Sequence, residues 1–355
     1  MTSLPPDDDS QSMGHAALLE YWYAVCRSAA LQREPKALML FGTPIVVFRN
    51  EAGLAMTLAD RCPHRNAPLS AGTVKKNGNL QCAYHGWEFR GDGTCAHIPG
   101  RLGTIPAKLG HGVRYATEER HGLVWVYAAA DAEPARGLAS LVSAPPAGRY
   151  VHILRELQVE APLLPTLENA LDVPHTAFLH RGLFRGAQPH RITATVTRSP
   201  DRVVTEYTGE PRPTGLIAKL LSPSGGLVEH SDRFMLPSVA EVEYKIGTEN
   251  HFLVTAYCTP VNEQHTKLFA RVAYRTRALG WLMRPLLEAA AMRIFRQDAA
   301  MLKLQSDNQH QFGGEHYLNT ELDLMGPHIR RLLKEAETHL ELSAVVAARK
   351  VEFDA

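Results

Sequence analysis

Two short cysteine and histidine motifs constrain the fold of this chain more than any other feature. The first is Cys62-Pro63-His64, and the second, seventeen residues later, is Cys82-Ala83-Tyr84-His85. Each is short enough to form one tight loop that presents a thiol and an imidazole. Gly72 and Gly78 lie between them, as expected if two hairpin-like turns face each other. The sequence therefore predicts a fold that brings two separate loops together around metal.

Two thiolates and two imidazoles are the ligands of a Rieske [2Fe–2S] cluster, in which histidines replace two of the cysteines on one iron. We predict that Cys62 and Cys82 bind one iron and that His64 and His85 bind the other. A structural zinc ion is the alternative, because the same four groups suit tetrahedral Zn²⁺. Zinc fingers place both cysteines before both histidines, whereas here the two types alternate, which favours the cluster.

The pattern of strand and turn signals divides the chain into a tail and two domains. Short β-branched and aromatic runs, such as those at 44–48 and 122–127, alternate with glycine-containing turns at 76–79 and 90–93. We therefore predict a tail over residues 1–20 and an all-β domain over 21–130. The Ala/Pro-rich segment 131–148 indicates a linker, and residues 149–355 are expected to form a second domain.

The second domain mixes strand patterns with helix patterns. Antiparallel strands are predicted at 203–207, 239–246, 251–259 and 267–274. The segment 168–180 is helical at its start, and one long helix is expected from Pro285 to about Gln309, with the proline in its first turn. A helix that begins already at Gly280 and is kinked by Pro285 is the alternative. Strands gathered with separate helices indicate an α+β domain, and hence an α+β chain.

Composition excludes several classes of protein. The 355 residues are 45% hydrophobic and 21% charged, with a formal net charge of +1, so charge gives no reason to expect nucleic acid or an anionic membrane as a partner. No apolar run reaches the roughly 18 residues of a membrane span. The N-terminal ten residues carry three aspartates and no apolar core, unlike a secretory signal. Five scattered cysteines do not suggest a disulfide framework, so a cytoplasmic location is expected.

The cysteine and histidine motifs resemble those of the Rieske non-heme iron oxygenases. Cys62-Pro63-His64-Arg65 is followed by Cys82-x-x-His85-Gly86-Trp87-x-Phe89, and then by Gly93 and Pro99. The resemblance extends from about Tyr21 to His310. It implies an all-β Rieske domain followed by an α+β catalytic domain, in which an antiparallel sheet is flanked by helices and holds a mononuclear iron.

A second motif, Asn169-x₂-Asp172-x₂-His175-x₄-His180, resembles the mononuclear iron motif of the same family. An iron(II) that activates O₂ needs two histidines and one carboxylate on one face and open positions on the other. Residues five apart on a regular helix point in different directions, so His175 and His180 can share a metal only if the helix ends or distorts between them. Pro174 and Gly182 nearby make that distortion plausible.

The third iron ligand is expected to be Asp298, in a segment that resembles the family's C-terminal helix with the iron carboxylate. Met301, Leu302 and Gln305 would share its helix face, and a mostly apolar face with one acid suits a buried ligand. A solvated surface role for Asp298 is the alternative, and Asp232, Asp307 and Glu315 are rival ligands.

Two further residues of the motif are expected to support catalysis. Asp172 resembles the family's bridging acid, which hydrogen-bonds a Rieske histidine across a subunit boundary. Its alternative role is to hold His175 within its own subunit. Asn169 matches the motif, with a less defined role.

The resemblance also implies a reaction and partners. A separate NAD(P)H-dependent reductase or ferredoxin would supply electrons, O₂ would be a substrate, and a homotrimer would pair one subunit's cluster with the next subunit's iron. The loose nucleotide-binding pattern Gly91-x-Gly93-x-x-Ala96 is interpreted as a turn, so the reductase must be another polypeptide.

The substrate is expected to be a small, largely apolar ring compound. Apolar residues near the second motif suggest the pocket, namely Phe178, Leu183, Phe184, Phe234, Met235, Leu236 and Phe295. The chain length and the Asn169–Asp172 spacing resemble the monooxygenase and demethylase branch, so hydroxylation or oxidative demethylation is favoured. Arene cis-dihydroxylation is the alternative reaction. An electron-transfer protein with only the Rieske cluster, or a binding protein with structural zinc, is the alternative of another class.

Overall fold

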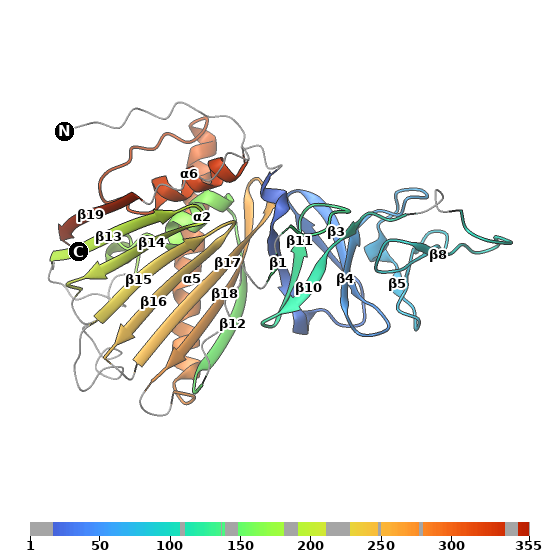
Figure 1. Cartoon of the computed structure of the whole chain (residues 1–355), viewed down its shortest axis with the longest axis horizontal. Helices are drawn as coiled ribbons and strands as arrows, with labels where there is room; N and C mark the ends of the chain where they lie inside the picture. The colour runs from blue at the N-terminus through green and yellow to red at the C-terminus, as the bar shows by residue number, and fades with distance from the viewer. Residues whose placement is uncertain are drawn as a thin grey trace.

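The computed structural model describes residues 17–106, 111–135, 137–138, 148–180, 191–210, 228–247, 250–276, 280–337 and 347–354. Most of the predicted tail and most of the predicted linker lie outside these residues. The described parts form three small antiparallel sheets in the N-terminal third and one large antiparallel sheet with helices in the remainder (Figure 1). The predicted fold class, an all-β domain followed by an α+β domain, is confirmed.

The N-terminal sheets combine pairs of consecutive strands with pairs of strands that lie far apart in the sequence. The first sheet has the order β1-β11-β10, the second β2-β3-β4-β9 and the third β5-β6-β7-β8. Their bounds are β1 Trp22–Arg27, β2 Lys36–Leu40, β3 Thr43–Arg49, β4 Ala55–Ala59, β5 Thr73–Val74, β6 Leu80–Gln81, β7 Glu88–Phe89, β8 Cys95–His97, β9 Arg114–Tyr115, β10 Thr117–Arg120 and β11 Leu123–Tyr127. Short 3₁₀ turns stand at Ala17–Glu20, Ser28–Ala30 and Leu69–Ala71. Figure 1 shows β5 and β8 at the end of the molecule farthest from the large sheet.

The segment with the loose nucleotide-binding pattern is a turn followed by a strand, as predicted. Residues 91–93 form the turn and β8 begins at Cys95, so no helix opens after the glycines.

The large sheet has eight strands in the order β12-β18-β17-β16-β15-β14-β13-β19. Their bounds are β12 Val151–Val159, β13 Arg191–Ser199, β14 Arg202–Thr208, β15 Val228–Met235, β16 Val239–Ile246, β17 Asn250–Asn262, β18 His265–Arg275 and β19 Ala347–Asp354. The four predicted strands of this domain are β14, β16, β17 and β18.

Within the described residues, four helices accompany the large sheet: α2 Leu163–Ala170, α3 Thr176–Leu179, α5 Arg284–Gln311 and α6 Gly326–Glu337. Pro285 lies in the first turn of α5 and the preceding residues form a turn, so the predicted start is confirmed and a kink at Pro285 is not found. The helix before the histidine pair begins at Leu163, five residues earlier than expected, and ends at Ala170. None of the helices in the described residues is both long and apolar enough to cross a membrane.

Alternation along the strands gives the large sheet two different faces. On one face, Phe234, Ala240 and Cys258 belong to the main core together with Leu167 of α2 and Leu302 of α5. We call this the helix face. Figure 1 shows α5 crossing behind the sheet, on that side.

The opposite face of the sheet carries the N-terminal domain at one end. Val239, Tyr257 and Phe269 pack there against Trp22 and Trp125 of β1 and β11. Backbone hydrogen bonds join the two parts as well, from Phe41 N–H to the Pro260 carbonyl at 3.0 Å and from Gly42 N–H to the Val261 carbonyl at 2.8 Å.

Candidate functional site

The two cysteine and histidine loops have the same hydrogen-bonding pattern. Cys62 N–H donates to the carbonyl of Ala67 at 2.8 Å, and Cys82 N–H donates to the carbonyl of Trp87, also at 2.8 Å. The Cys62 carbonyl accepts from Asn66 N–H, and the Cys82 carbonyl accepts from the N–H of the residue four positions on, Gly86. Asn66 and Gly86 both have positive φ values, 59° and 69°, which residues such as glycine and asparagine tolerate best. Two equivalent tight loops therefore present equivalent cysteine and histidine pairs.

The loops place the thiols inside and the imidazoles toward the surface. Cys62 and Cys82 are 1% and 2% exposed and lie in a core cluster with Leu69 and Phe89, whereas the side chain of His85 is exposed. The rings of His64 and His85 lie 4.6 Å apart, and burial together with the neighbouring Cys82 thiol raises the pKa of Cys62 to about 11. The four side chains thus form one thiol pair and one imidazole pair.

This pairing fits a two-iron cluster better than a single zinc ion. Zinc would gather all four ligand atoms around one point. Among the described residues, three possible metal ligands converge within 4.8 Å of one another at His175, whereas these four side chains do not converge in that way. The Nδ1 atom of His64 is buried without a hydrogen-bond partner in the described structure, as a nitrogen reserved for a metal would be. The residues therefore fit the cluster.

Trp87 supports the imidazole pair in a way that the sequence did not reveal. Its indole stacks on the ring of His64, with centroids 4.6 Å apart and planes 7° from parallel.

All five cysteines of the chain are free thiols. The sequence likewise predicts no disulfide framework.

The second histidine pair is brought together by a very short helix. Helix α2 ends at Ala170, and α3 covers only the four residues between His175 and His180, which stand at its two ends. The Nε2 atoms of the two rings lie 3.3 Å apart. The expectation that the helix must break for the two histidines to meet is therefore confirmed.

Helix α5 brings a carboxylate to the same point. Asp298 Oδ1 lies 3.0 Å from His180 Nε2 and 3.4 Å from His175 Nε2. This oxygen is buried and has no hydrogen-bond partner in the described structure. Two imidazoles and one carboxylate, converging within 4.8 Å, are the ligand set that suits a non-heme iron(II). We call these three residues the 2-His-1-carboxylate group, and they fit a mononuclear iron.

The outer nitrogen of each imidazole is bound to an acceptor. His175 Nδ1 contacts the backbone carbonyl of Asp172, and His180 Nδ1 lies 3.1 Å from Gln297 Oε1. Both rings can therefore keep their proton on Nδ1 and present Nε2 toward Asp298. Gln297 was not predicted from the sequence, although it directly precedes Asp298.

Asp172 and Asn169 lie at the edge of this group. Asp172 is 42% exposed, and its Oδ2 lies 3.4 Å from His175 Nδ1, so a contact within the subunit is present. Asn169 lies in the last turn of α2, where its carbonyl accepts from Asp172 N–H. Burial lowers the pKa of His175, but the neighbouring carboxylates of Asp172 and Asp298 outweigh this and raise it to about 9.

The rival carboxylates contact other side chains. Asp232 lies beside His230, Asp307 beside Lys303, and Glu315 beside Arg330. The helix-face argument for Asp298 was only partly right: Leu302 is buried, but Met301 is 47% exposed and Gln305 is exposed too.

The apolar residues suggested for a pocket have different surroundings. Phe234 and Leu236 are buried core, Phe295 packs against residues of β12 and β18, and Phe178 is 76% exposed. Leu183 and Phe184 lie outside the described residues. An apolar pocket formed by this set stays a prediction.

Comparison with known protein families identifies both parts of the chain. Residues 21–106 match the Rieske [2Fe-2S] domain, and residues 159–339 match the vanillate O-demethylase oxygenase C-terminal domain. The second match covers just over half of the chain. The chain therefore belongs to the Rieske non-heme iron oxygenases, in the branch of monooxygenases and demethylases.

Individual relatives match over part of their length. The chain is 38% identical over 176 residues to chlorophyllide a oxygenase of Chlamydomonas reinhardtii, covering 48% of this chain and 26% of that protein. It is 36% identical over 165 residues to the oxygenase component of dicamba O-demethylase of Stenotrophomonas maltophilia, covering 45% and 47%. The chain thus spans about half or less of these relatives.

Solved structures match over nearly their whole length. Dicamba monooxygenase bound to 3,6-dichlorosalicylic acid superposes with a TM-score of 0.79 at 22% identity, covering 91% of this chain and 98% of that one. Pseudomonas putida CBB5 NdmA superposes with a TM-score of 0.72 at 23% identity, covering 95% and 98%. At this identity the likeness shows the shared fold. One structure of dicamba monooxygenase contains non-heme iron.

Proposed function

We propose that this protein is a terminal oxygenase that hydroxylates or oxidatively demethylates a small, largely apolar ring compound. The convergence of His175, His180 and Asp298 carries the proposal, because two imidazoles and one carboxylate leave coordination positions open for O₂ chemistry. The dicamba O-demethylase relative supports demethylation as the reaction. When bound, the cluster supplies electrons and the mononuclear iron activates O₂.

The protein side chains hold and orient these groups. Cys62 and Cys82 would bind the buried iron of the cluster, and His64 and His85 the iron nearer the surface. The exposed side chain of His85 supports electron entry and exit at this end. At the second site, Gln297 and the carbonyl of Asp172 keep the ligand imidazoles in the tautomer that leaves Nε2 free.

Electron transfer between the two sites is proposed to cross a subunit boundary. Within one chain the cluster loops lie beside β5 to β8, at the far end from the large sheet (Figure 1). A head-to-tail ring, most simply a homotrimer, would place the cluster of one subunit next to the iron group of its neighbour. Asp172 contacts His175 and is 42% exposed, which supports a role for it in contacting a Rieske histidine of that neighbour.

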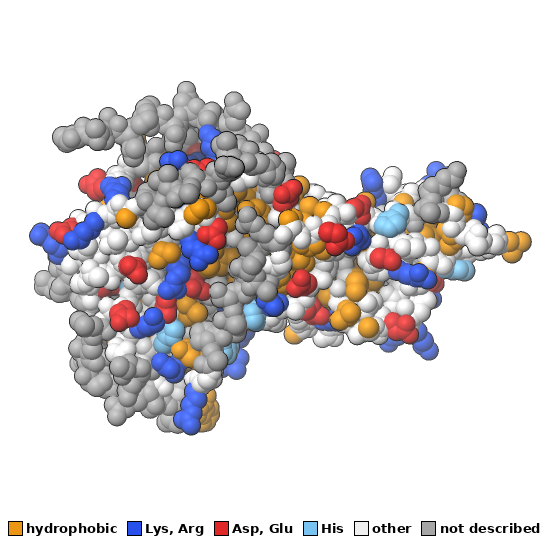
Figure 2. Space-filling model, viewed as in Figure 1, with side chains coloured by type: hydrophobic (Ala, Val, Ile, Leu, Met, Phe, Trp, Pro, Cys, Tyr) orange, Lys and Arg blue, Asp and Glu red, His pale blue; other side chains and the backbone are white. Residues whose placement is uncertain are grey.

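The remaining parts of the proposal concern organisation and partners. We assign residues 21–130 to the Rieske domain and 149–355 to the catalytic domain, joined by the linker 131–148. A separate NAD(P)H-dependent reductase or ferredoxin would donate electrons in the cytoplasm. On the face shown in Figure 2, basic and acidic side chains are interspersed.

Replacing the proposed iron carboxylate tests this function. In Asp298→Ala, O₂-dependent formaldehyde release from a methoxyarene should be abolished, while the absorption spectrum of the [2Fe–2S] cluster stays unchanged. Asp307→Ala, on the exposed surface of the same helix, serves as the control. Undiminished turnover in Asp298→Ala would refute the iron assignment, and an electron-transfer protein without oxygenase activity predicts that Asp298 is dispensable.

A further inference from the structure

Several buried polar atoms without partners gather on two neighbouring strands of the large sheet. Thr205 Oγ1 and Tyr207 Oη on β14, and Asp232 Oδ2 on β15, are buried and make no hydrogen bond in the described structure. Thr205 is 0% exposed, Asp232 is 0% and Tyr207 is 3%. Buried polar atoms nearly always have partners, so three exceptions in one place require an explanation.

The three atoms lie close together because of the strand register. Thr205 stands directly opposite Asp232, and Tyr207 opposite His230. Directly paired side chains on one face are about 5 Å apart at Cβ. Burial raises the pKa of Tyr207 well above its usual value and the nearby Asp232 carboxylate adds to this, so the two side chains lie close together. We call Thr205, Tyr207 and Asp232 the polar pit.

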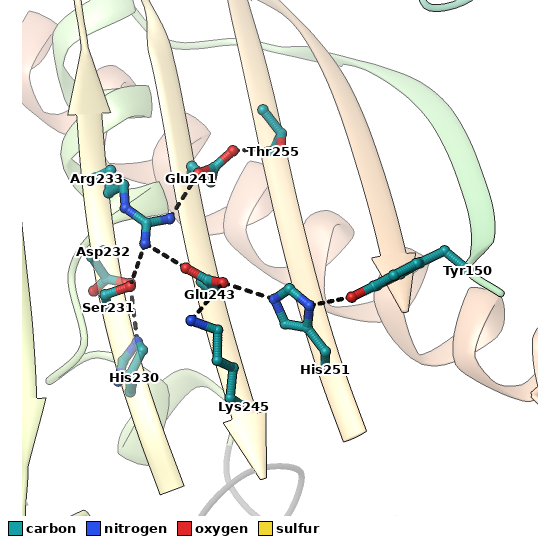
Figure 3. Close-up of polar contacts among 10 residues, drawn as sticks. All are labelled: Tyr150, His230, Ser231, Asp232, Arg233, Glu241, Glu243, Lys245, His251 and Thr255. Carbon is teal, nitrogen blue, oxygen red and sulfur yellow. Dashed lines mark hydrogen bonds and ion pairs between the residues drawn. The ribbon is translucent and has the colours of Figure 1, made fainter. Parts of the chain in front are cut away.

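His230 holds Asp232, the acidic residue of the polar pit, in place. His230 Nε2 lies 3.0 Å from Asp232 Oδ1, and its Nδ1 lies 2.8 Å from Glu210 Oε2. The His230 ring is sandwiched between Tyr207 and Tyr244, at centroid distances of 4.3 and 4.0 Å. Figure 3 shows His230 and Asp232 together on β15. One oxygen of Asp232 is thus held in place, and the other is left to accept a hydrogen bond.

His230 lies between two acidic side chains, Asp232 and Glu210. Burial lowers the pKa of His230, but Asp232 and Glu210 outweigh it and raise the pKa to about 9, so the imidazole is a cation between two carboxylates. Asp232 Oδ2 is buried and makes no hydrogen bond in the described structure, and a buried acceptor without a partner is costly unless something compensates it. A cation or an N–H donor at Asp232 Oδ2 would do so, and the two hydroxyls can accept or donate beside it.

The polar pit lies on the helix face, toward the 2-His-1-carboxylate group. By alternation Asp232 shares a face with Phe234, and Thr205 shares one with Tyr207. Phe234 and Tyr207 belong to the same core as Val173, two residues before His175, and Leu302, one helical turn after Asp298. The sheet layer with the polar pit and the helices with the metal group are therefore joined by one continuous core.

We propose that the polar pit recognises a substrate through a hydrogen-bond-donating nitrogen, an ammonium or N–H group, which binds Asp232 Oδ2 beside the hydroxyls of Thr205 and Tyr207. His230 acts as a positioning residue that fixes Asp232. The inference rests on the proposed function, because it places this nitrogen on the ring compound that the oxygenase acts on. It predicts that donor-bearing rings are preferred over rings of the same shape without a donor.

Equilibrium dialysis with the intact holoenzyme tests this preference without requiring turnover. The probes are 3-methoxybenzylamine and 1-ethyl-3-methoxybenzene, which have nearly the same shape and differ in the ammonium group. The wild type should bind the amine at least about tenfold more tightly, since a hydrogen bond to a charged group contributes that much or more. In Asp232→Asn the two affinities should become nearly equal.

A second variant and a control keep the test decisive. Thr205→Val, which preserves side-chain volume, should reduce the preference severalfold even if Asp232→Asn fails to fold. Glu229→Gln, at an exposed position of β15, the strand that carries Asp232, should leave the preference for the amine unchanged. Equal binding of both probes by the wild type, as expected if the pit holds only ordered water, would overturn the inference, and so would a preference that survives both pit variants.

Measuring binding and turnover together distinguishes failure of the inference from failure of the proposed function. Formaldehyde release from the two probes, measured in the same preparations, reports demethylation. Turnover without a preference in binding would overturn the polar pit alone. A preference without any turnover would keep the pit and count against demethylation.

Discussion

At the 2-His-1-carboxylate group, each of the two proposed histidine ligands is oriented by a residue outside the group. His180 Nδ1 lies 3.1 Å from Gln297 Oε1, and His175 Nδ1 contacts the carbonyl of Asp172. A backbone acceptor cannot be removed by substitution, whereas the Gln297 amide can. Gln297 is therefore the position at which ligand orientation can be tested without removing a ligand.

Gln297→Ala should weaken retention of the mononuclear iron about tenfold or more, because loss of such a hydrogen bond frees the ring and its tautomer. The measurement is the Fe(II) concentration that restores half of the activity to iron-depleted protein. Gln305→Ala, exposed on the same helix, should behave like wild type. Equal iron affinity in both variants would show that Gln297 does not orient His180.

The sequence identifies the proposed metal ligands more readily than the residues that support them. Cysteine, histidine and aspartate at family spacing carry chemistry that few other residues supply, so they stand out in the sequence. Gln297 and Trp87 act through a contact distance and a ring stacking, which depend on how α5 and the cluster loops pack. Likewise, the contact of His230 with Glu210 joins residues twenty positions apart and has no signature in the sequence.

Among the elements, the turn between the two cluster loops makes a close backbone approach that only glycine allows. Gly78 has a φ of +74°, and a Cβ there would lie 2.0 Å from the backbone nitrogen of Glu51. Gly53 has nearly the same φ, +78°, but a Cβ added there would meet nothing within 4 Å. Substitutions at the two glycines therefore distinguish the cost of a positive φ from the cost of a steric collision.

Gly78→Ala should destabilise the protein by more than about 2 kcal/mol and lower its cluster content, because a positive φ and a backbone collision add up. Gly53→Ala should cost only about 1 kcal/mol, from the positive φ alone. Chemical denaturation and the cluster absorbance per chain measure the two effects. Equal losses in both variants would contradict the collision at Glu51.

On the face of the large sheet opposite the helix face, a charged network spans β15, β16 and β17 (Figure 3). Arg233 contacts both Glu241 and Glu243, and Glu243 lies 2.8 Å from His251 Nε2 and 3.2 Å from Lys245. Burial raises the pKa of Glu243, but the cationic neighbours outweigh it and lower the pKa from 4.5 to about 2. The ionised carboxylate therefore stabilises the folded state.

The sign of this shift predicts how the stability depends on pH. The contribution is complete above pH 4.5 and is lost as the pH falls toward 2, where the folded state also becomes protonated. Wild type should exceed Glu243→Gln in unfolding free energy by up to about 3 kcal/mol near neutral pH, and this difference should vanish near pH 2. Urea titrations across this range measure it, with Glu229→Gln as the control. A difference that stays constant with pH would contradict the account.

Elements with a strong local pattern were predictable, and those set by tertiary packing were not. The β16 bounds coincide with the predicted 239–246, because alternation and turns mark its ends. The start of α2 at Leu163 was missed, since Pro162 and Pro165 weaken its helical pattern and its stability comes from the buried leucines 163, 164 and 167. Met301 was misplaced because the burial of a helix face depends on what packs against it.

For the whole molecule, the separation of the two sites along one chain predicts cooperation between subunits. A chain lacking the cluster, Cys82→Ser, and a chain lacking the iron carboxylate, Asp298→Ala, should each be inactive alone. Co-assembled in equal amounts in a head-to-tail ring, they should regain about one quarter of wild-type turnover, because half of the iron sites are intact and half of those face an intact cluster.

The control for this experiment is a mixture of the two purified variants that cannot exchange subunits, which should stay inactive. A co-assembled sample without activity would mean that each subunit transfers electrons within itself. Asp172 would then have only its contact with His175 inside the same chain.

The central claim, that one chain carries both a two-iron cluster and a separate mononuclear iron, is tested most directly by metal analysis. Iron and acid-labile sulfide per chain should be measured on protein purified without oxygen. The account predicts about three irons and two sulfides. Zinc without sulfide, or two irons and two sulfides that do not rise to three irons when Fe(II) is added, would contradict it.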